Sequence, residues 1–260
     1  MDLLTVNSQR LEVRQISGSA LLAPLVFLHE GLGSVSAWTQ RGLDWPLAVC
    51  SATRRAGLVY SRIGYGQSAP APPGRNTLHA DYLHREAYNV LPALLAQLNI
   101  TSPVLLGHSD GASIALLYAS KHPSSACIAM APHVLVEPIA LRAIAAAKAA
   151  FESGGLRDKL AKFHLDVDGA FWQWNDVWLS SSFASFDIRK ACGQITAPLL
   201  LLQGEDDAYG TMRQLDEIAL VAPHAQQLRL AQCGHSPHRD QPQLALKAAT
   251  DFLSRSEERL

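Results

Sequence analysis

The sequence is poor in the features that mark metal-binding, disulfide-bonded or secreted proteins. Its 260 residues include only four cysteines, and no two of them stand at the C-x-x-C spacing of a zinc ribbon or a thioredoxin-like site. Such cysteines are typical of a reducing compartment, so we expect buried, reduced thiols and a cytoplasmic protein. The N-terminal stretch MDLLTVNSQRLEVRQ carries charged residues where a signal peptide would need an apolar core.

A strong charge of one sign and a long apolar run are also missing. The 22 lysines and arginines nearly balance the 23 aspartates and glutamates, giving a formal net charge of −1. That balance does not favour a nucleic-acid or acidic-lipid partner. No apolar run reaches the roughly 18 residues that a membrane-spanning helix needs. We therefore expect a small-molecule partner rather than a nucleic acid or a membrane, and the sequence leaves a homodimer open.

What the sequence does contain is an alternation of short apolar runs with helical patterns. The apolar runs, bounded by turn residues, cover 25–29, 57–61, 104–107, 126–130 and 198–203. Runs that are apolar throughout suit strands buried on both faces. Helical patterns follow at 79–98, 112–121, 211–221 and 242–254. This order predicts an α/β fold with a mostly parallel central sheet flanked by helices, preceded by an antiparallel hairpin over 3–16.

The alternation breaks between residues 134 and 190. This segment opens with an alanine-rich helical run, which a pair of glycines ends, and it also carries three of the five tryptophans, Trp172, Trp174 and Trp178. We interpret 134–190 as a helical cap inserted into a core formed by 1–133 and 191–260. The tryptophans predict an aromatic wall of a substrate pocket, although packing of the cap onto the core explains each of them equally well.

A reactive serine is predicted where one buried strand stops. Residues 107–111 read G-H-S-D-G and fit G-x-S-x-G, with a strand pattern before them and a helical pattern after. The two glycines permit the close backbone approach of a sharp strand-to-helix turn. Ser109 then stands at a helix N-terminus, where backbone N–H groups favour developing negative charge. A helix-capping serine in a glycine-rich turn is the simpler alternative, and this motif alone does not decide between them.

A serine hydroxyl is a poor nucleophile at neutral pH, so it needs a base and an acid that orients the base. His235 follows a late apolar stretch, and the glycine before it permits close approach, which favours it over His238. Three acidic residues, among them Asp206 and Asp207, follow the apolar run at 198–203. There a carboxylate would share the sheet edge that hosts ligands in open α/β sheets. An acidic turn that caps the next helix is the alternative.

The loop HEGLGS, residues 29–34, follows the first long apolar strand. A glycine-rich loop there can aim a backbone N–H at the same point as the N–H of Asp110, which follows the serine. One such oxyanion donor is worth roughly 3–4 kcal/mol of transition-state stabilisation. His29-Glu30 does not begin a zinc motif, because Gly33 stands where the second histidine would be. We expect no metal and no organic cofactor.

Together these motifs resemble the α/β-hydrolase superfamily, in its serine-nucleophile branch with a small helical cap. The segments LHEGLGS, YSRIGYGQS, LLGHSDGAS, LLLQGEDDAYGT and CGHSPHRDQP occur in the family's order over nearly the whole chain. The resemblance implies an α/β-hydrolase fold and a complete Ser-His-Asp set. It implies that Ser109 is the nucleophile, His235 the base and Asp207 the acid, with Asp206 as the rival acid. It also implies that the oxyanion donors are Gly31 and Asp110, with Glu30 as the rival.

One position departs from the family pattern, which commonly has His-Gly where this chain has His29-Glu30. Glu30 could stiffen the loop through hydrogen bonds, which is the interpretation we favour. It could instead face the pocket and repel anionic substrates, or serve as a second acid or base. Arg62 and Tyr65, in SRIGYGQS, are expected to organise their turn rather than to contact substrate.

Three functions fit this set of residues. We favour a serine hydrolase that cleaves a small ester or thioester through an acyl-enzyme. The alternative is a C–C bond hydrolase of the meta-cleavage-product type, which the sequence also resembles. Such enzymes tend to bind substrates with extra carboxylates, and no arginine is obviously aimed at the pocket among Arg62, Arg142, Arg157 and Arg189. A non-catalytic ligand-binding hydrolase fold is the third, disfavoured because a binding protein does not need the complete catalytic set.

Overall fold

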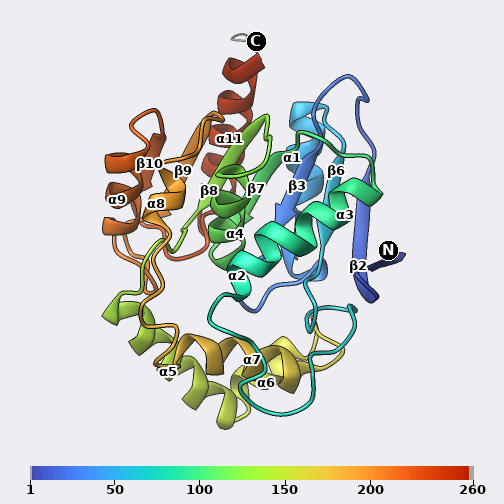
Figure 1. Ribbon diagram of the computed structural model, residues 1–260. Helices are drawn as coiled ribbons and strands as arrows, with labels where there is room; N and C mark the ends of the chain where they lie inside the picture. The colour runs from blue at the N-terminus through green and yellow to red at the C-terminus, as the bar shows by residue number, and fades with distance from the viewer. Residues whose placement is uncertain (1, 258–260) are drawn as a thin grey trace.

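One eight-stranded sheet organises the chain, in the order β1-β2-β6-β3-β7-β8-β9-β10 (Figure 1). The computed structural model describes residues 2–257. In this sheet every neighbouring pair from β6 to β10 is parallel, and β2 alone runs the other way, antiparallel to both β1 and β6. The strands are β1 (Asp2–Val6), β2 (Gln9–Ile16), β3 (Leu25–Leu28), β6 (Gly57–Tyr60), β7 (Val104–His108), β8 (Ala126–Met130), β9 (Leu199–Gly204) and β10 (Gln226–Leu230). The predicted fold class is confirmed.

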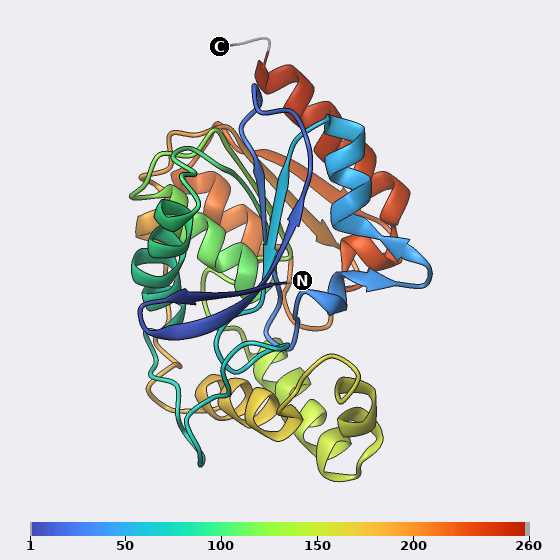
Figure 2. The ribbon, with the colours of Figure 1, turned by 90° about the vertical axis from the view of Figure 1, so that its right-hand side faces the viewer.

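Helices cover both faces of this sheet, and its central strands are accordingly largely apolar. Every residue of β3, β6, β7, β8 and β9 is buried. Seen from the side, α1 and α11 lie on one face and α3, α4 and α9 on the other (Figure 2). These helices are α1 (Trp45–Thr53), α3 (Leu91–Gln97), α4 (Asp110–Ala119), α9 (Arg213–Val221) and α11 (Pro242–Glu257). No helix within residues 2–257 is both long enough and apolar enough to cross a membrane.

Two helical regions differ from the sequence-based expectation. The pattern at 79–98 forms α2 (Tyr82–Arg85), a π-helical turn at Glu86–Val90 and then α3, rather than one uniform α-helix. Helix α1 was not predicted. Its signals were in the sequence, because Asp44 caps it by accepting a hydrogen bond from Leu47 N (3.1 Å) and Pro46 stands in its first turn.

The segment predicted as a cap lies beyond the carboxyl ends of the strands, at the bottom of Figure 1. It contains α5 (Pro138–Glu152), α6 (Gly155–Leu160) and α7 (Val167–Trp178), and the short α8 (Arg189–Cys192) returns the chain to the sheet layers. Ile188 N donates to Val134 O (2.8 Å), so the two ends of the segment run side by side. We keep 134–190 as the proposed cap on this geometry. All four cysteines are buried and unpaired, as expected.

The turn from β7 into α4 leaves no room for side chains on its two glycines. A Cβ on Gly107 would lie 2.2 Å from Gly111 O, and a Cβ on Gly111 would lie 2.0 Å from Leu28 O of the neighbouring strand. Between them Ser109 has φ 54° and ψ −119°, a strained conformation for a residue with a side chain. The helix therefore packs onto β3 with its backbone and points Ser109 out of the turn.

We expect Gly111→Ala to destabilise the fold, because the added methyl group meets backbone that cannot move aside. Overpacking of this kind costs about 1–3 kcal/mol. The free energy of unfolding, measured by urea denaturation, reports the loss. Gly155→Ala is the matched control, since a Cβ at that helix start meets nothing within 4 Å. Equal stability of the two variants would contradict the proposed close approach.

Candidate active site

Side chains from three loops meet at the carboxyl edge of the sheet. The hydroxyl of Ser109 lies 2.9 Å from Nε2 of His235, which follows β10. On its other side, Nδ1 of His235 lies 2.9 Å from both carboxylate oxygens of Asp207, which follows β9. With a proton on Nδ1, the imidazole donates to the carboxylate and accepts from the serine. The three predicted residues thus form one continuous hydrogen-bonded chain.

Surrounding donors hold the Asp207 carboxylate in its ionised form. Its Oδ1 accepts the backbone N–H groups of Tyr209 (2.8 Å) and Gly210 (3.2 Å). Burial alone would raise the pKa of Asp207, but the hydrogen bond and charge of His235 and the Tyr209 N–H bring that pKa below its ordinary value. The rival Asp206 is exposed, and within residues 2–257 its carboxylate makes no hydrogen bond to His235. The geometry therefore favours Asp207 as the acid.

The two predicted oxyanion donors face the same pocket as the serine. Gly31 and Asp110 both line it, and neither of their backbone N–H groups donates to another group within residues 2–257. The carbonyl of Glu30 accepts from His29 Nδ1 (2.7 Å), Arg62 Nη2 (2.8 Å) and Gly33 N (3.1 Å). Because a trans peptide is planar, fixing that C=O also fixes the opposed N–H of Gly31.

Arg62 organises its surroundings without lining the pocket. Besides holding the Glu30 carbonyl, its guanidinium lies 3.7 Å from the carboxylate of Asp110. That carboxylate also accepts Tyr82 OH (2.7 Å) and Trp178 Nε1 (3.3 Å), which ties the proposed cap to the serine turn. Burial raises the pKa of Asp110 above its ordinary value, although Arg62, Tyr82 and Trp178 all oppose the rise.

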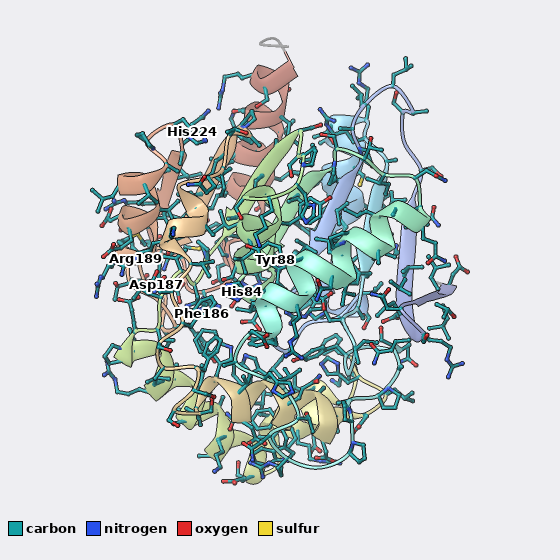
Figure 3. All side chains as sticks on the ribbon, in the orientation of Figure 1. His84, Tyr88, Phe186, Asp187, Arg189 and His224 are labelled. Atoms are coloured by element: carbon teal, nitrogen blue, oxygen red, sulfur yellow. The ribbon has the colours of Figure 1, made fainter. Side chains whose placement is uncertain are left out.

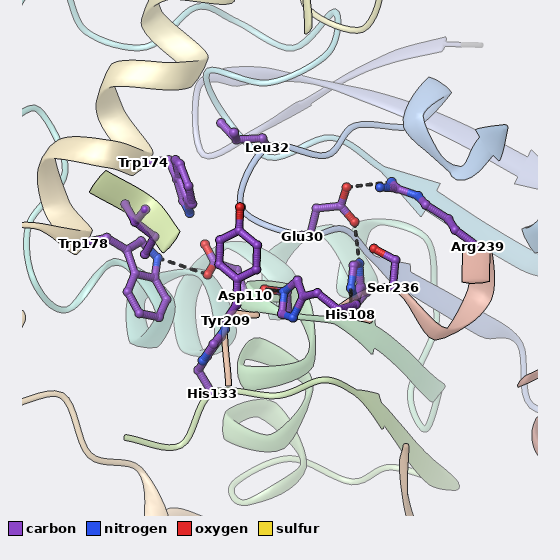
Figure 4. A pocket seen from close by; sticks show the side chains of 14 residues that line it. Glu30, Leu32, His108, Asp110, His133, Trp174, Trp178, Tyr209, Ser236 and Arg239 are labelled. Atoms are coloured by element: carbon purple, nitrogen blue, oxygen red, sulfur yellow. Dashed lines mark hydrogen bonds and ion pairs between the residues drawn. The ribbon is translucent and has the colours of Figure 1, made fainter. Parts of the chain in front are cut away.

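The pocket above Ser109 has a volume of about 230 Å³ and two kinds of wall (Figure 4). Its largely apolar side is formed by Leu32, Ile144, Trp174, Trp178 and Tyr209. Its polar side is formed by Glu30, His108, Ser236 and Arg239, whereas His133 packs against the ring of Trp178 on the apolar side. The prediction for Trp172 was wrong, because this residue does not line the pocket. Its ring packs on Phe151 and Phe171 instead, with the Arg75 guanidinium 3.7 Å from the ring centre.

Sequence reasoning missed the polar wall, although Glu30 was singled out. The carboxylate of Glu30 faces the pocket and is engaged at both oxygens, by Arg239 Nη2 (2.6 Å) and by His108 Nδ1 (Figure 4). Burial would raise the pKa of Glu30, but Arg239 and His108 together bring that pKa well below its ordinary value. Glu30 is thus fixed by hydrogen bonds within its surroundings and also faces the pocket, so its position fits both alternatives considered from the sequence. Nearby His133 is buried beside His235, and its pKa falls to about 3 because of burial and that neighbour.

The arginine that reaches the pocket was not among those considered from sequence. Arg157 pairs with Asp168 and Arg189 with Asp187, both away from the pocket, and Arg142 is exposed. Arg239 fills that place from the short helix α10 (Pro237–Asp240). The available signal was its position four residues after the predicted base.

One group of side chains has a composition that could suit a metal ion. Glu30, His108 and His238 each offer an atom within 4.8 Å of the others. Both oxygens of Glu30 and both ring nitrogens of His108 already have hydrogen-bond partners, and the Arg239 guanidinium lies against the carboxylate. A cation there would have to displace these bonds beside a fixed positive charge, so the contacts favour a hydrogen-bonded network.

Comparison with known proteins gives the family. The model of the Alpha/beta hydrolase family matches residues 25–249, most of the chain. The sn-1-specific diacylglycerol lipase ABHD11 of Mus musculus is 25% identical over 271 residues, covering 92% of this chain and 83% of that protein.

Solved structures agree with this assignment. The enol-lactonase of Burkholderia xenovorans LB400 superposes with a TM-score of 0.73 at 20% identity, covering 97% of this chain and all 100% of the other. A carboxylesterase structure from Nitrososphaera gargenis gives a TM-score of 0.77 at 18% identity, with 100% of both chains covered. At these identities the two likenesses concern the fold, and the family match rests on sequence. The chain belongs to the alpha/beta hydrolase family and is a hydrolase.

Proposed function

We propose that the chain is a serine hydrolase that cleaves a small carboxylic ester or thioester through an acyl-enzyme. The observation that carries this proposal is the hydrogen-bonded chain from Ser109 through His235 to Asp207, opening onto a pocket. A capping serine would not need a half-buried imidazole and an ionised carboxylate in line behind its hydroxyl. The proposed nucleophile also sits at the start of α4, where an unpaired N–H and the helix dipole favour an oxyanion.

The proposed reaction follows from this arrangement. Ser109 Oγ attacks the carbonyl carbon while its proton moves to His235 Nε2, and the carbonyl electron pair moves onto oxygen. The N–H groups of Gly31 and Asp110 receive that oxyanion. Collapse of the intermediate expels the alcohol or thiol, which takes the proton from His235. Water, deprotonated by His235, then attacks the acyl group and releases the acid and the free serine.

The pocket favours a compact acyl group with apolar surface. Its volume is about 230 Å³, and one side is built from Ile144, Trp174 and Trp178. The named activities of the relatives support ester chemistry, since a lipase, a lactonase and a carboxylesterase all cleave esters. The names of these relatives do not identify the substrate of this chain.

A C–C bond hydrolase stays the second candidate because an arginine does line the pocket. Arg239 could hold a substrate carboxylate, which is the feature that this reaction class calls for. Its guanidinium is already paired with Glu30 at 2.6 Å, however. The charge available to a second carboxylate is therefore reduced, and we rank ester hydrolysis first.

The proposal predicts a steep loss of activity when Ser109, His235 or Asp207 is substituted. Ser109→Ala should lower kcat toward p-nitrophenyl acetate or butyrate by about 10⁶-fold. Asp207→Asn should lower it by about 10⁴-fold, since the amide stabilises the wrong imidazole tautomer. His235→Ala should also abolish turnover. The matched control is Asp206→Asn, which changes an exposed neighbour and should stay near wild type. Labelling by a fluorophosphonate probe should follow the same order.

Two results would contradict this proposal in different ways. A wild-type protein that no fluorophosphonate labels would exclude an activated Ser109. A wild type that is labelled and inert to every short ester, but cleaves a dienol-diketone, would favour C–C bond hydrolysis instead.

The pocket wall makes a further prediction about chain length. Trp174 lies directly over Gly31, so that a Cβ on this glycine would meet Trp174 Nε1 at 2.1 Å. Trp174→Ala should open space beside the carbonyl and raise the octanoate-to-acetate ratio of kcat/KM by about tenfold or more, since one buried methylene is worth about 10–200-fold. Trp172→Ala, outside the pocket, is the control and should leave this ratio unchanged. An unchanged ratio in both variants would remove Trp174 from the acyl site.

A further inference from the structure

A chain of polar contacts joins the three loops that carry the proposed machinery. Glu30 directly precedes the oxyanion donor Gly31, and His108 directly precedes Ser109. His108 Nδ1 contacts a carboxylate oxygen of Glu30, and His108 Nε2 lies 2.7 Å from the backbone carbonyl of His235 (Figure 4). His108 is thus placed between the oxyanion loop and the base loop, within the turn that presents the nucleophile.

Counting donors and acceptors determines the protonation of this ring. A backbone carbonyl can only accept, so the Nε2 that faces His235 must carry a proton. The Glu30 carboxylate, whose other oxygen accepts from Arg239 at 2.6 Å, can only accept as long as it is ionised. Burial raises the pKa of Glu30, but the Arg239 guanidinium opposes that effect, and the pKa lies well below its ordinary value. The Nδ1 must therefore carry a proton as well.

We infer that His108 is held as an imidazolium that bridges Glu30 and the His235 carbonyl, and that this charged bridge positions the oxyanion loop and the base around Ser109. Its consequence for turnover rests on the proposed serine-hydrolase function. Its protonation does not. His108 is a positioning residue here, because it acts through its neighbours and both of its ring nitrogens are occupied.

The charges around the bridge are consistent with one imidazolium. Arg239 is positive and Glu30 negative, so a positive His108 alternates in sign along the chain of contacts. The ring of His238 packs edge-on at 4.8 Å from that of His108, and burial lowers the pKa of His238 well below its ordinary value. His133 is likewise neutral at pH 7, with a pKa of about 3. His235, at 5.2 Å between ring centres, completes the titratable neighbours, with its own negative partner in Asp207.

The His108 ring at the centre of the bridge is buried, which limits how far water could replace its lost contacts. His108 is only 1% exposed. Hydrogen bonds to charged groups contribute about 1.5–3 kcal/mol each, and an unmade buried one costs a similar amount. A base loop that loses its carbonyl anchor would shift relative to Ser109. A misplacement of about 1 Å can cost about 10²-fold in rate.

Two amide substitutions separate the two halves of the bridge. The amide nitrogen of His108→Gln replaces Nε2 and can still donate to the His235 carbonyl, whereas that of His108→Asn replaces Nδ1 and reaches only Glu30. We expect His108→Asn to lower kcat about 10²-fold with little change in KM. His108→Gln should stay within about tenfold of wild type, because it keeps the contact that holds the base. His224→Asn is the matched control, at an exposed histidine far from the site (Figure 3).

The protonation itself is measured without turnover, by ¹⁵N NMR of histidine rings in the Ser109→Ala protein. His108 should show two protonated ring nitrogens at pH 7, and Glu30→Gln should convert it to a neutral ring with the proton on Nε2.

A neutral His108 ring at pH 7, or full activity in His108→Asn, would overturn the inference. If the His108→Asn protein fails to fold, the ¹⁵N NMR spectrum of the His108 ring and its change in Glu30→Gln decide the inference. Failure of the serine-hydrolase proposal has a different signature, which is turnover that survives Ser109→Ala.

Discussion

The constraint on which the site depends is the lack of space at the β7–α4 turn. Backbone meets backbone at Gly107 and Gly111, and the second contact is with the neighbouring strand β3 rather than with the turn itself. The close approach at Gly111 therefore fixes the β7–α4 turn relative to the loop that follows β3. The start of α4 is pressed against the end of β3, and Asp110 and Gly31 line the same pocket. The position of the pocket is therefore a consequence of how closely these two segments of backbone pack.

The fold and the central three residues were readable from sequence because their signals are local. Apolar runs of strand length alternate with helical patterns, and each proposed catalytic residue follows the end of a parallel strand. Parallel strands bring their carboxyl ends to one edge, so Ser109, Asp207 and His235 had to converge even though they are far apart in sequence. The choice of Asp207 over Asp206 is a matter of one residue. It rests in the structure on burial and on two backbone N–H donors that a single sequence does not display.

The polar wall was out of reach for a different reason. Glu30 and Arg239 come together across almost the whole chain, and no local pattern encodes which loop tips touch. The placement of Trp172 in the pocket wall is a different case, because this mistaken prediction was avoidable. On a helix, Trp174 and Trp178 are four residues apart and share a face, whereas Trp172 points roughly opposite to Trp174. Once α7 is accepted as a helix, two of its tryptophans can face the pocket and the third must face away.

The way the chain leaves and rejoins the sheet has a consequence for diversification. Val134 and Ile188 are hydrogen-bonded neighbours, so the segment between them leaves the sheet layers and returns to them at one place. Its other contacts with the core include bonds to loops, as where His164 bonds Gly66 N and Leu32 O. The segment could change in length or sequence without requiring any strand to move. Its remaining link to the serine turn runs through Trp178 and the Asp110 carboxylate. Within such a design, substrate preference and bond-breaking chemistry can evolve on separate parts of the chain, provided that the contacts between the segment and the loops of the core are kept or replaced.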